Sequence, residues 1–324
     1  MRHYSNFTRR ELLRDATLGA AALILPELLA ACNPGESTPA RRREEDPDLE
    51  RLSSWVGTLR AEGLAVNNIP LGRVAIRVGE LAAGTPYVPF TLETYLESGG
   101  SPLQEPLSLS LTRFDCVTLV ESCLAVARVA RGDGRPTWDR FGLEIERMRY
   151  RGGERRGYTS RLHYFSEWIT DGEKRGLMKN LGAELGGAED TRPIRFMTEH
   201  REKYRALADK AVFREIWRNE RRISDRPRLV VPTKRIPEVV DRIESGDVLA
   251  FATEIPGLDV THTAFAYRDQ RGMLRVLHAP LSGGLVEVPR TTLPEYVAAI
   301  RRATGILVAR PLPESISVGA RSPH

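Results

Sequence analysis

The sequence predicts an α+β protein, with helices in the first half of its folded part and antiparallel strands in the second. Three observations support this prediction. Apolar residues recur at helical spacing over 48–84. A long apolar run follows Asp115, a residue suited to cap a helix. From Leu229 onwards, short β-like runs alternate with turn residues.

Composition narrows the class of protein. The chain has 324 residues, 41% of them hydrophobic, so it can bury a sizeable core. Its net charge of +5 comes from 48 basic and 43 acidic residues that are interspersed, which favours a solvated mixed-sign surface and argues against a nucleic-acid partner. Three cysteines, one of them near the N-terminus, exclude a disulfide scaffold.

The first 32 residues have the pattern of an export signal. A basic start precedes an apolar run, Ala16–Ala31, that is short for a membrane span and is interrupted by Pro26. Arg9-Arg10 resembles a twin-arginine signal, and Leu29–Cys32 resembles the lipobox of bacterial lipoproteins, in which the Cys is lipidated. An ordinary secretory leader and a buried helix are the alternatives. We expect an exported bacterial lipoprotein, periplasmic or in the cell envelope, anchored to a membrane through Cys32.

Domain limits follow from changes in composition. The stretch 33–48 lacks apolar periodicity and is rich in Pro, Gly, Ser and charge, so we expect a flexible tether. The folded domain is expected over 49–311. The polar end of the chain, 312–324, is expected to be a disordered tail.

Helical and extended segments come first within the folded part. Helices are expected over 48–63 and 70–84, the second with Pro at its start and Gly at its end. A Pro-broken extended stretch covers 84–96, and a helix covers 115–130. The region 138–219 is rich in Arg and aromatic residues and alternates helix with loop, and its pattern gives no finer assignment.

The β-like runs complete the predicted domain. Each is short, rich in β-branched or aromatic residues, and bounded by turn residues. They cover 228–233, 246–254, 260–269, 273–280, 284–289 and 305–312.

Two thiols lie on the helix expected over 115–130. Cys116 and Cys123 are two turns apart, about 10 Å, which exceeds the roughly 7 Å limit for a disulfide. Cys116 is at the helix start, where unpaired N–H groups and the macrodipole favour a thiolate and lower its pKa. Cys123 has apolar neighbours, and burial raises the pKa of a thiol. We predict that Cys116 is a nucleophile and that Cys123 is a core residue.

A thiolate nucleophile needs an imidazole base that is oriented by a third polar group. His262 and His278 lie on neighbouring β-like runs. A three-residue loop, 270–272, closed by a left-handed Gly272, places His278 opposite Ala264 and diagonal to His262. An even-numbered loop sends His278 to the other face, and two core histidines are the alternative interpretation.

Small residues share the predicted face of His262. Ala264 and Ala266 leave room for a helix to approach the sheet closely. We therefore expect the helix that begins with Cys116 to pack against this face, which brings the thiol to His262.

No metal or other cofactor is expected. The chain has no HExxH sequence and no paired CxxC motifs. His163 and Glu167 have a suitable helical spacing, but no third ligand is evident in the sequence.

Several segments resemble a known family. "FDCVTLVE", "SGDVLAF", "GLDVTHTAFAY" and "LHA" resemble the motifs around the Cys and the two His residues of NlpC-type cell-wall cysteine hydrolases, which have a papain-like α+β fold. "GTPYV", "YTSRLHYFSEW" and "GLDVTH" further resemble the N-acetylmuramoyl-L-alanine amidase-like branch. Together these segments cover most of 84–310.

The resemblance implies a papain-like NlpC-type core with a large helical and loop insertion. It further implies Cys116 as the nucleophile, His262 as the general base and His278 as the orienting residue. Tyr87 matches a Tyr that borders the peptide-binding cleft in related hydrolases. Asp115 is a candidate for binding the amino or stem-peptide groups of the substrate, with a helix-capping role as the alternative.

The middle region carries further candidates for substrate binding. Tyr158, Ser160 and Arg161 form a polar cluster, and a guanidinium suits a carboxylate or a sugar ring. A purely structural loop network is the alternative. Arg and aromatic side chains of this region are expected to form a wall for a muramoyl group, namely Tyr150, Tyr158, Arg161, Tyr164 and Trp168.

These features together predict a cysteine-dependent amidase that acts on peptidoglycan, with no cofactor. The expected bond joins N-acetylmuramic acid to L-alanine in peptidoglycan fragments. Two alternatives remain at this point. One is an endopeptidase of the same superfamily that cuts within the stem peptide, and the other is a non-catalytic murein-binding lipoprotein.

Overall fold

The structure is a computed structural model of the chain and describes residues 46–281 and 284–313. The predicted export signal, Cys32, most of the tether and nearly all of the predicted tail lie outside the described residues. Across the described ranges, none of the helices has the length and apolar character needed to cross a membrane.

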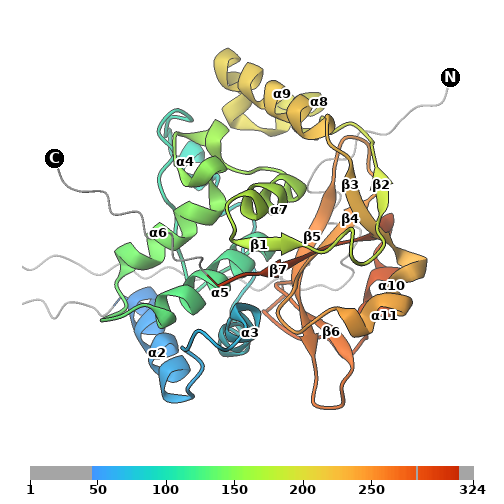
Figure 1. The fold of residues 1–324 in the computed structure, drawn as a ribbon. Coiled ribbons are helices and arrows are strands. Elements are labelled where there is room, and N and C mark those ends of the chain that lie inside the picture. Colours follow the sequence, from blue (N-terminus) through green and yellow to red (C-terminus); the bar gives the residue numbers. More distant parts are fainter. Residues whose placement is uncertain (1–45, 282–283, 314–324) are drawn as a thin grey trace, which may run out of the picture.

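The helices expected in the first half are present (Figure 1). Asp46 caps the first, accepting a 3.0 Å hydrogen bond from the backbone N–H of Asp48, and Pro47 occupies its first turn. Asp115 and Thr118 form a capping box at the start of the helix that begins with Cys116. The elements are α2 (Pro47–Ala61), α3 (Leu71–Leu81), α4 (Thr94–Glu97), α5 (Cys116–Arg131) and α6 (Trp138–Arg149).

The middle region, which the sequence left unassigned, contains both helices and short strands. A separate buried cluster holds it together, with Tyr164, Phe196 and Ile216 among its members. Its main elements are α7 (Phe165–Lys174), β1 (Met178–Asn180), β2 (Ala188–Asp190), α8 (Phe196–Glu199) and α9 (Lys210–Ser224).

The described residues form a seven-stranded sheet in the order β2-β3-β7-β4-β5-β6, with β1 also paired to β7, and every pairing is antiparallel. Short helices α10 (Ile236–Val239) and α11 (Leu293–Ala299) accompany it. The remaining strands match five of the six β-like runs: β3 (Arg228–Pro232), β4 (Val248–Thr253), β5 (Val260–Arg268), β6 (Leu274–Leu277) and β7 (Ala303–Pro311).

The prediction of a strand over the sixth run, 284–289, is wrong, because these residues do not form a continuous strand. It makes isolated bridges instead, one between Pro86 and Leu285 and one between His278 and Glu287. The run pairs with two different segments, one residue at a time, so a continuous ladder does not develop.

Helices cover both faces of the sheet (Figure 1). One core cluster joins the apolar faces of α2, α3, α5 and α6 to sheet residues that include Ala250, Phe265 and Leu307. The other joins α10 and α11 to the opposite face. Every residue of β4 is buried, which explains why its sequence is a continuous apolar run without polar alternation.

The expected contact between the Cys helix and the Ala264–Ala266 face is wrong. Both alanines belong to the cluster that contains Leu293 and Val297 of α11. Helix α5 instead packs against the other face of the sheet, where Phe265 lies. Successive strand residues point to opposite faces, so the small side chains make room for α11.

Candidate active site

Cys116 is the first residue of α5, and the chain before it is held on both sides. The carboxylate of Asp115 accepts a 2.7 Å hydrogen bond from the backbone N–H of Thr118, and the Asp115 N–H donates 2.8 Å to the Thr118 hydroxyl. Phe114 bonds both Pro86 and Val88 through its backbone. The helix-capping alternative for Asp115 is therefore realised, and a substrate contact by Asp115 stays a prediction.

The two thiols differ in exposure as predicted, but the pKa of Cys116 is not lowered as predicted. Cys116 is partly exposed, whereas Cys123 is buried in the core cluster. Although part of the Cys116 residue is exposed, its sulfur is surrounded by protein atoms. This burial raises the pKa of the Cys116 thiol to about 12, and the neighbouring Asp115 carboxylate adds to the rise. The expected low pKa of Cys116 is thus wrong for the free protein, because loss of hydration outweighs the N–H groups of Thr263 and Val117 that favour the thiolate.

His262 and His278 lie in direct contact. His262 Nε2 is 2.8 Å from His278 Nδ1. The predicted hairpin register is confirmed: Phe265 pairs with Leu277, which places His278 opposite Ala264. Gly272 closes the loop with a φ of 80°, the left-handed conformation that glycine adopts at no steric cost.

Both imidazoles are held in apolar surroundings. The His262 ring stacks on Phe251, with ring centroids 5.6 Å apart, and the Tyr296 hydroxyl lies 3.2 Å from His278 Nδ1. Burial holds the pKa of His262 well below its usual value and lowers that of His278 to about 4. Both rings are therefore neutral near pH 7. No motif had indicated Tyr296, which comes from α11.

Thr263 makes polar contacts that join the start of α5 to the strand that carries His262. The Thr263 hydroxyl donates a 2.9 Å hydrogen bond to the Cys116 carbonyl. Next to this contact the β4–β5 register shifts, so that Phe251 pairs with His262 and Ala252 with Val260. Such bulges re-aim side chains. The buried His262 Nδ1 has no hydrogen-bond partner among the described residues.

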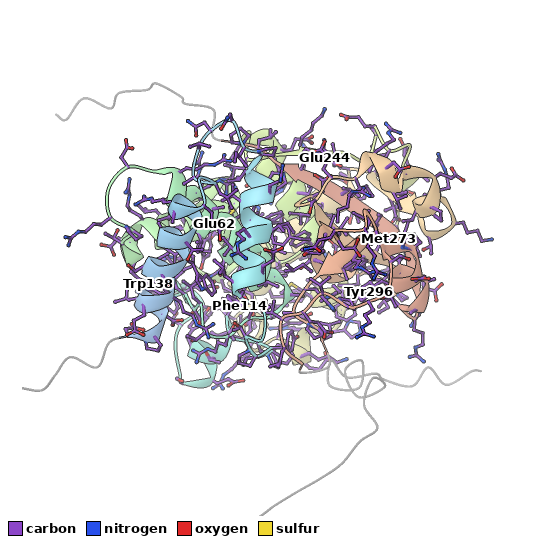
Figure 2. The ribbon with its side chains drawn as sticks, turned by 90° about the horizontal axis from the view of Figure 1, so that it is seen from below. Glu62, Phe114, Trp138, Glu244, Met273 and Tyr296 are labelled. Carbon is purple, nitrogen blue, oxygen red and sulfur yellow. The ribbon has the colours of Figure 1, made fainter. Side chains whose placement is uncertain are left out.

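The segment 284–288 is hydrogen-bonded to two of the predicted site residues, Tyr87 and His278. The Tyr87 N–H donates a 2.9 Å hydrogen bond to the Gly284 carbonyl, while His278 and Glu287 exchange backbone hydrogen bonds of 3.1 and 3.0 Å. Tyr87 also forms a parallel bridge with Phe114, two residues before Cys116. Figure 2 shows Phe114 near the middle of the molecule, between Trp138 on the helical side and Tyr296 on the sheet side.

From the predicted set, the structure brings His262 and His278 into contact and bonds Cys116 to Thr263, the residue that follows His262. Tyr87 pairs with Phe114, two residues before Cys116. In the described parts of the chain, no group of three or more His, Cys, Asp or Glu side chains is arranged to hold a metal ion. The groups available for chemistry here are the Cys116 thiol and a pair of neutral imidazoles, linked through Thr263.

Tyr158, Ser160 and Arg161 are accounted for by contacts within the protein. Arg161 is buried and forms ion pairs with Glu93 at 2.6 Å and Glu105 at 3.3 Å. The Ser160 hydroxyl bridges backbone groups of its own loop, and the Tyr158 ring is fully buried beneath the Arg161 guanidinium. The loop-network alternative describes these contacts. A direct substrate contact stays a prediction for Ser160, which is partly exposed, whereas the side chains of Tyr158 and Arg161 are buried.

The expected sugar-binding wall is wrong. Its members have at most 6% of their surface exposed and belong to the interior of the middle region. Tyr150, for example, donates a 2.9 Å hydrogen bond to the buried carboxylate of Glu105. A ring that is already packed on both faces cannot stack on a sugar. The residues for which the predicted surface position is wrong are Tyr150, Tyr158, Arg161, Tyr164 and Trp168.

Asp259, which was not predicted from the sequence, links the middle region to the strand that carries His262. It is buried, and its carboxylate accepts 2.8 Å hydrogen bonds from the N–H groups of Ser166, in the first turn of α7, and of Val260. The middle region is thereby fixed to the strand that carries His262. The signal was present, because Asp259 lies within the segment "GLDVTH" and Ser166 within "YTSRLHYFSEW".

Comparison with known proteins gives consistent results. A family model described as N-acetylmuramoyl-L-alanine amidase-like matches residues 77–306. The crystal structure of an N-acetylmuramoyl-L-alanine amidase from Bacteroides uniformis is similar, with 28% identity and a TM-score of 0.68 over 75% of this chain and 99% of that one. No curated protein matches the chain.

Two other solved structures share the fold. A protein from Bacteroides fragilis described as a candidate xylanase is 31% identical, with a TM-score of 0.65 over 72% of this chain and 99% of that one. A Legionella pneumophila protein is 18% identical, with a TM-score of 0.58 over 82% and 94% of the two chains, and this likeness concerns the fold alone. Because the family model spans most of the sequence, the chain belongs to the N-acetylmuramoyl-L-alanine amidase-like family.

Proposed function

We propose that the protein is a cysteine-dependent amidase with an NlpC-type, papain-like core, and that it hydrolyses the bond between N-acetylmuramic acid and L-alanine in peptidoglycan fragments. The observation that carries the proposal is the position of Cys116 at the start of α5, hydrogen-bonded to Thr263 beside a buried His262–His278 pair. A nucleophile, a base and an orienting group from separate elements constitute a catalytic arrangement.

The first step is a proton transfer. In the free protein the thiol and both imidazoles are neutral, because burial raises the pKa of Cys116 and lowers those of His262 and His278. His262 Nδ1, which has no other partner among the described residues, accepts the thiol proton as the thiolate attacks. The resulting imidazolium is stabilised by His278.

The remaining steps follow from the same residues. Attack of sulfur on the lactyl carbonyl carbon gives a tetrahedral oxyanion, which the Cys116 N–H stabilises at the first turn of α5, where N–H groups lack intrahelical partners. His262 returns the proton to the departing amine of L-alanine. Water then hydrolyses the thioester, releasing the sugar with its lactyl carboxylate and regenerating the thiol.

The choice of bond is supported by the family and by the name of the Bacteroides uniformis protein. A xylanase reaction is less well supported, because glycosidases usually use two carboxyl groups that flank the scissile bond. The site described above instead joins a thiol to two imidazoles. Peptidoglycan fragments are therefore the substrate class that we propose.

Digestion of purified peptidoglycan fragments tests this function. Mass analysis of the products is expected to show the free muramoyl sugar and an intact stem peptide. The Cys116→Ala variant is expected to lose turnover while remaining folded, and Cys123→Ala to keep it. A sugar still attached to L-alanine or to a dipeptide indicates the endopeptidase. Wild-type protein that binds fragments without cleaving them indicates the non-catalytic lipoprotein.

We further propose that the protein is exported and anchored to a membrane by a lipid on Cys32. The support is the sequence of the leader, with Arg9-Arg10 ahead of an apolar run that ends at Leu29–Cys32. The mature protein is expected to partition into detergent, and Cys32→Ala to release it in soluble form. Replacement of Arg9-Arg10 by Lys-Lys is expected to stop export. Normal export of that variant indicates the general secretory route.

A further inference from the structure

Glu287 lies beside the histidine pair and belongs to no motif discussed so far. Its backbone is fixed opposite His278 by two mutual hydrogen bonds. Its side chain is 55% exposed, and its carboxylate oxygen Oε1 is 3.9 Å from His278 Nε2, on the opposite side of the ring from His262. His278 thus has a different partner facing each of its ring nitrogens.

The direction of hydrogen bonding through the pair decides whether His262 can act as a base. A neutral imidazole carries one proton, on either of its nitrogens. His262 accepts the thiol proton at Nδ1 only when its own proton is on Nε2, from which it donates to His278 Nδ1. His278 must then carry its proton on Nε2, facing Glu287.

The hydrogen bond between the two imidazoles can also run in the reverse direction, from His278 to His262. If the His278 proton is on Nδ1, it donates to His262 Nε2 at 2.8 Å or to the Tyr296 hydroxyl at 3.2 Å. The His262 proton is then on Nδ1, so His262 cannot accept a proton from Cys116. The Tyr296 hydroxyl, being able to accept as well as donate, does not oppose this reversed state.

We propose that Glu287 is a positioning residue: its carboxylate favours the Nε2–H form of His278 and thereby sets His262 in the tautomer that accepts the proton of Cys116. This inference rests on the proposed function of the same site. The carboxylate accepts only, so it favours a proton on the nitrogen that faces it. Among the described residues, Glu287 is the acidic side chain within ion-pair distance of His278.

The same carboxylate acts again during the reaction. Once His262 holds two protons, the buried pair carries a positive charge. Glu287 then faces the outer nitrogen of that pair, and attraction between opposite charges lowers the cost of forming the imidazolium. An uncharged acceptor at the same position keeps the tautomer but loses this attraction.

Nitrogen-15 NMR of the full chain labelled at histidine tests the proposal directly, because the ring nitrogens report which one carries the proton. We expect His278 to be in the Nε2–H form near pH 7.5. Glu287→Ala is expected to shift it toward the Nδ1–H form, and Glu287→Gln, whose amide oxygen still accepts, to preserve it. Glu97→Gln, at an exposed glutamate on α4, is the matched control and should change nothing.

Kinetics on peptidoglycan fragments provide the second readout. Glu287→Ala is expected to lower kcat by about tenfold, with KM little changed. This is the lower end of the loss caused by removing an outer-shell partner of a metal-ligating histidine, which likewise orients an imidazole. Glu287→Gln is expected to fall between Glu287→Ala and wild type. Adding Tyr296→Phe to Glu287→Ala removes one acceptor for the reversed form and is expected to restore part of the Nε2–H population.

A wild-type His278 found in the Nδ1–H form, or a tautomer unaffected by Glu287→Ala, overturns the proposal. These NMR results do not depend on turnover. If the tautomers behave as expected while Cys116→Ala retains full activity, the proposed cysteine mechanism fails and the placement of Glu287 stands. The two failures are therefore distinguishable.

Discussion

The Thr263 hydroxyl donates a 2.9 Å hydrogen bond to the Cys116 carbonyl and so joins residues that are 147 positions apart. Cys116 begins α5, and Thr263 follows His262 on β5. α5 packs on one face of the sheet, whereas the His262 ring stacks with Phe251, which belongs to the cluster on the other face. The Thr263 bond therefore ties the start of α5 to the residue next to His262. We expect the contact between these two residues to align the thiol with the imidazole.

Removing this hydroxyl is expected to affect activity more than stability. Thr263→Val keeps the shape of the side chain but loses the bond, so we expect the free energy of unfolding to fall by about 1 kcal/mol. Thr263→Ser retains the donor and is the matched control. Activity on peptidoglycan fragments should fall clearly in the valine variant and remain near wild type in the serine variant. Equal activity of the two variants contradicts an aligning role for the bond.

Much of the fold was predictable because its signals are local. The helix cap at Asp115 and the β-like runs were evident in the sequence, and the position of Gly272 set the hairpin register that brings His278 to His262. The motif residues Cys116, His262 and His278 could be chosen because few residue types perform nucleophilic and base chemistry.

The remaining features depend on non-local packing. The expected low pKa of Cys116 considered only the helix start, whereas the thiol is also surrounded by parts of the chain that are distant in sequence. The aromatic residues of the middle region were expected at the surface, yet Tyr164 donates a 2.6 Å hydrogen bond to Glu220 in the interior. Their sequence pattern does not distinguish a binding wall from a second core.

Alkylation of Cys116 is expected to be slow near neutral pH and to accelerate as the pH rises. Burial raises its thiol pKa to about 12, so the reactive thiolate fraction grows about tenfold per pH unit below that value. Iodoacetamide labelling of a variant carrying Cys32→Ser and Cys123→Ala isolates this residue. A rate that is already maximal at pH 7 contradicts the prediction and indicates a resting thiolate–imidazolium pair.

Buried His278 is expected to reduce stability as the pH falls. Its pKa is about 4 in the folded protein against 6.5 for an ordinary histidine, so between these values the unfolded chain binds more protons. The free energy of unfolding should lose about 2 kcal/mol from this residue between pH 7.5 and pH 5. Other groups titrate as well, so the measurement is the difference between wild type and His278→Gln in urea unfolding at each pH. A difference that stays constant with pH contradicts the assignment.

Loss of one partner of the ion pair between Glu121 and Arg149 is expected to lower the free energy of unfolding strongly. Both side chains are at most 3% exposed, and Arg149 Nε donates a 2.8 Å hydrogen bond to Glu121. Losing one partner leaves a buried charge, so Glu121→Gln should cost about 3–5 kcal/mol. The exposed pair between Glu215 and Arg218 is the control, and Glu215→Gln should change stability by less than about 0.5 kcal/mol. Similar costs for both variants, measured by urea unfolding, contradict this prediction.

Two helical glycines are expected to respond to alanine in opposite directions. A Cβ at Gly72 in α3 would lie 2.7 Å from the carbonyl oxygen of Gly246, a backbone atom that cannot move without shifting the turn before β4. Gly72→Ala should therefore destabilise the protein by about 1–3 kcal/mol. At Gly57 in α2 an added Cβ meets nothing within 4 Å, and Gly57→Ala should stabilise the protein by about 0.5–1 kcal/mol through helix propensity. Urea midpoints that move in the same direction for both variants contradict the close packing of α3 on the Gly246 turn.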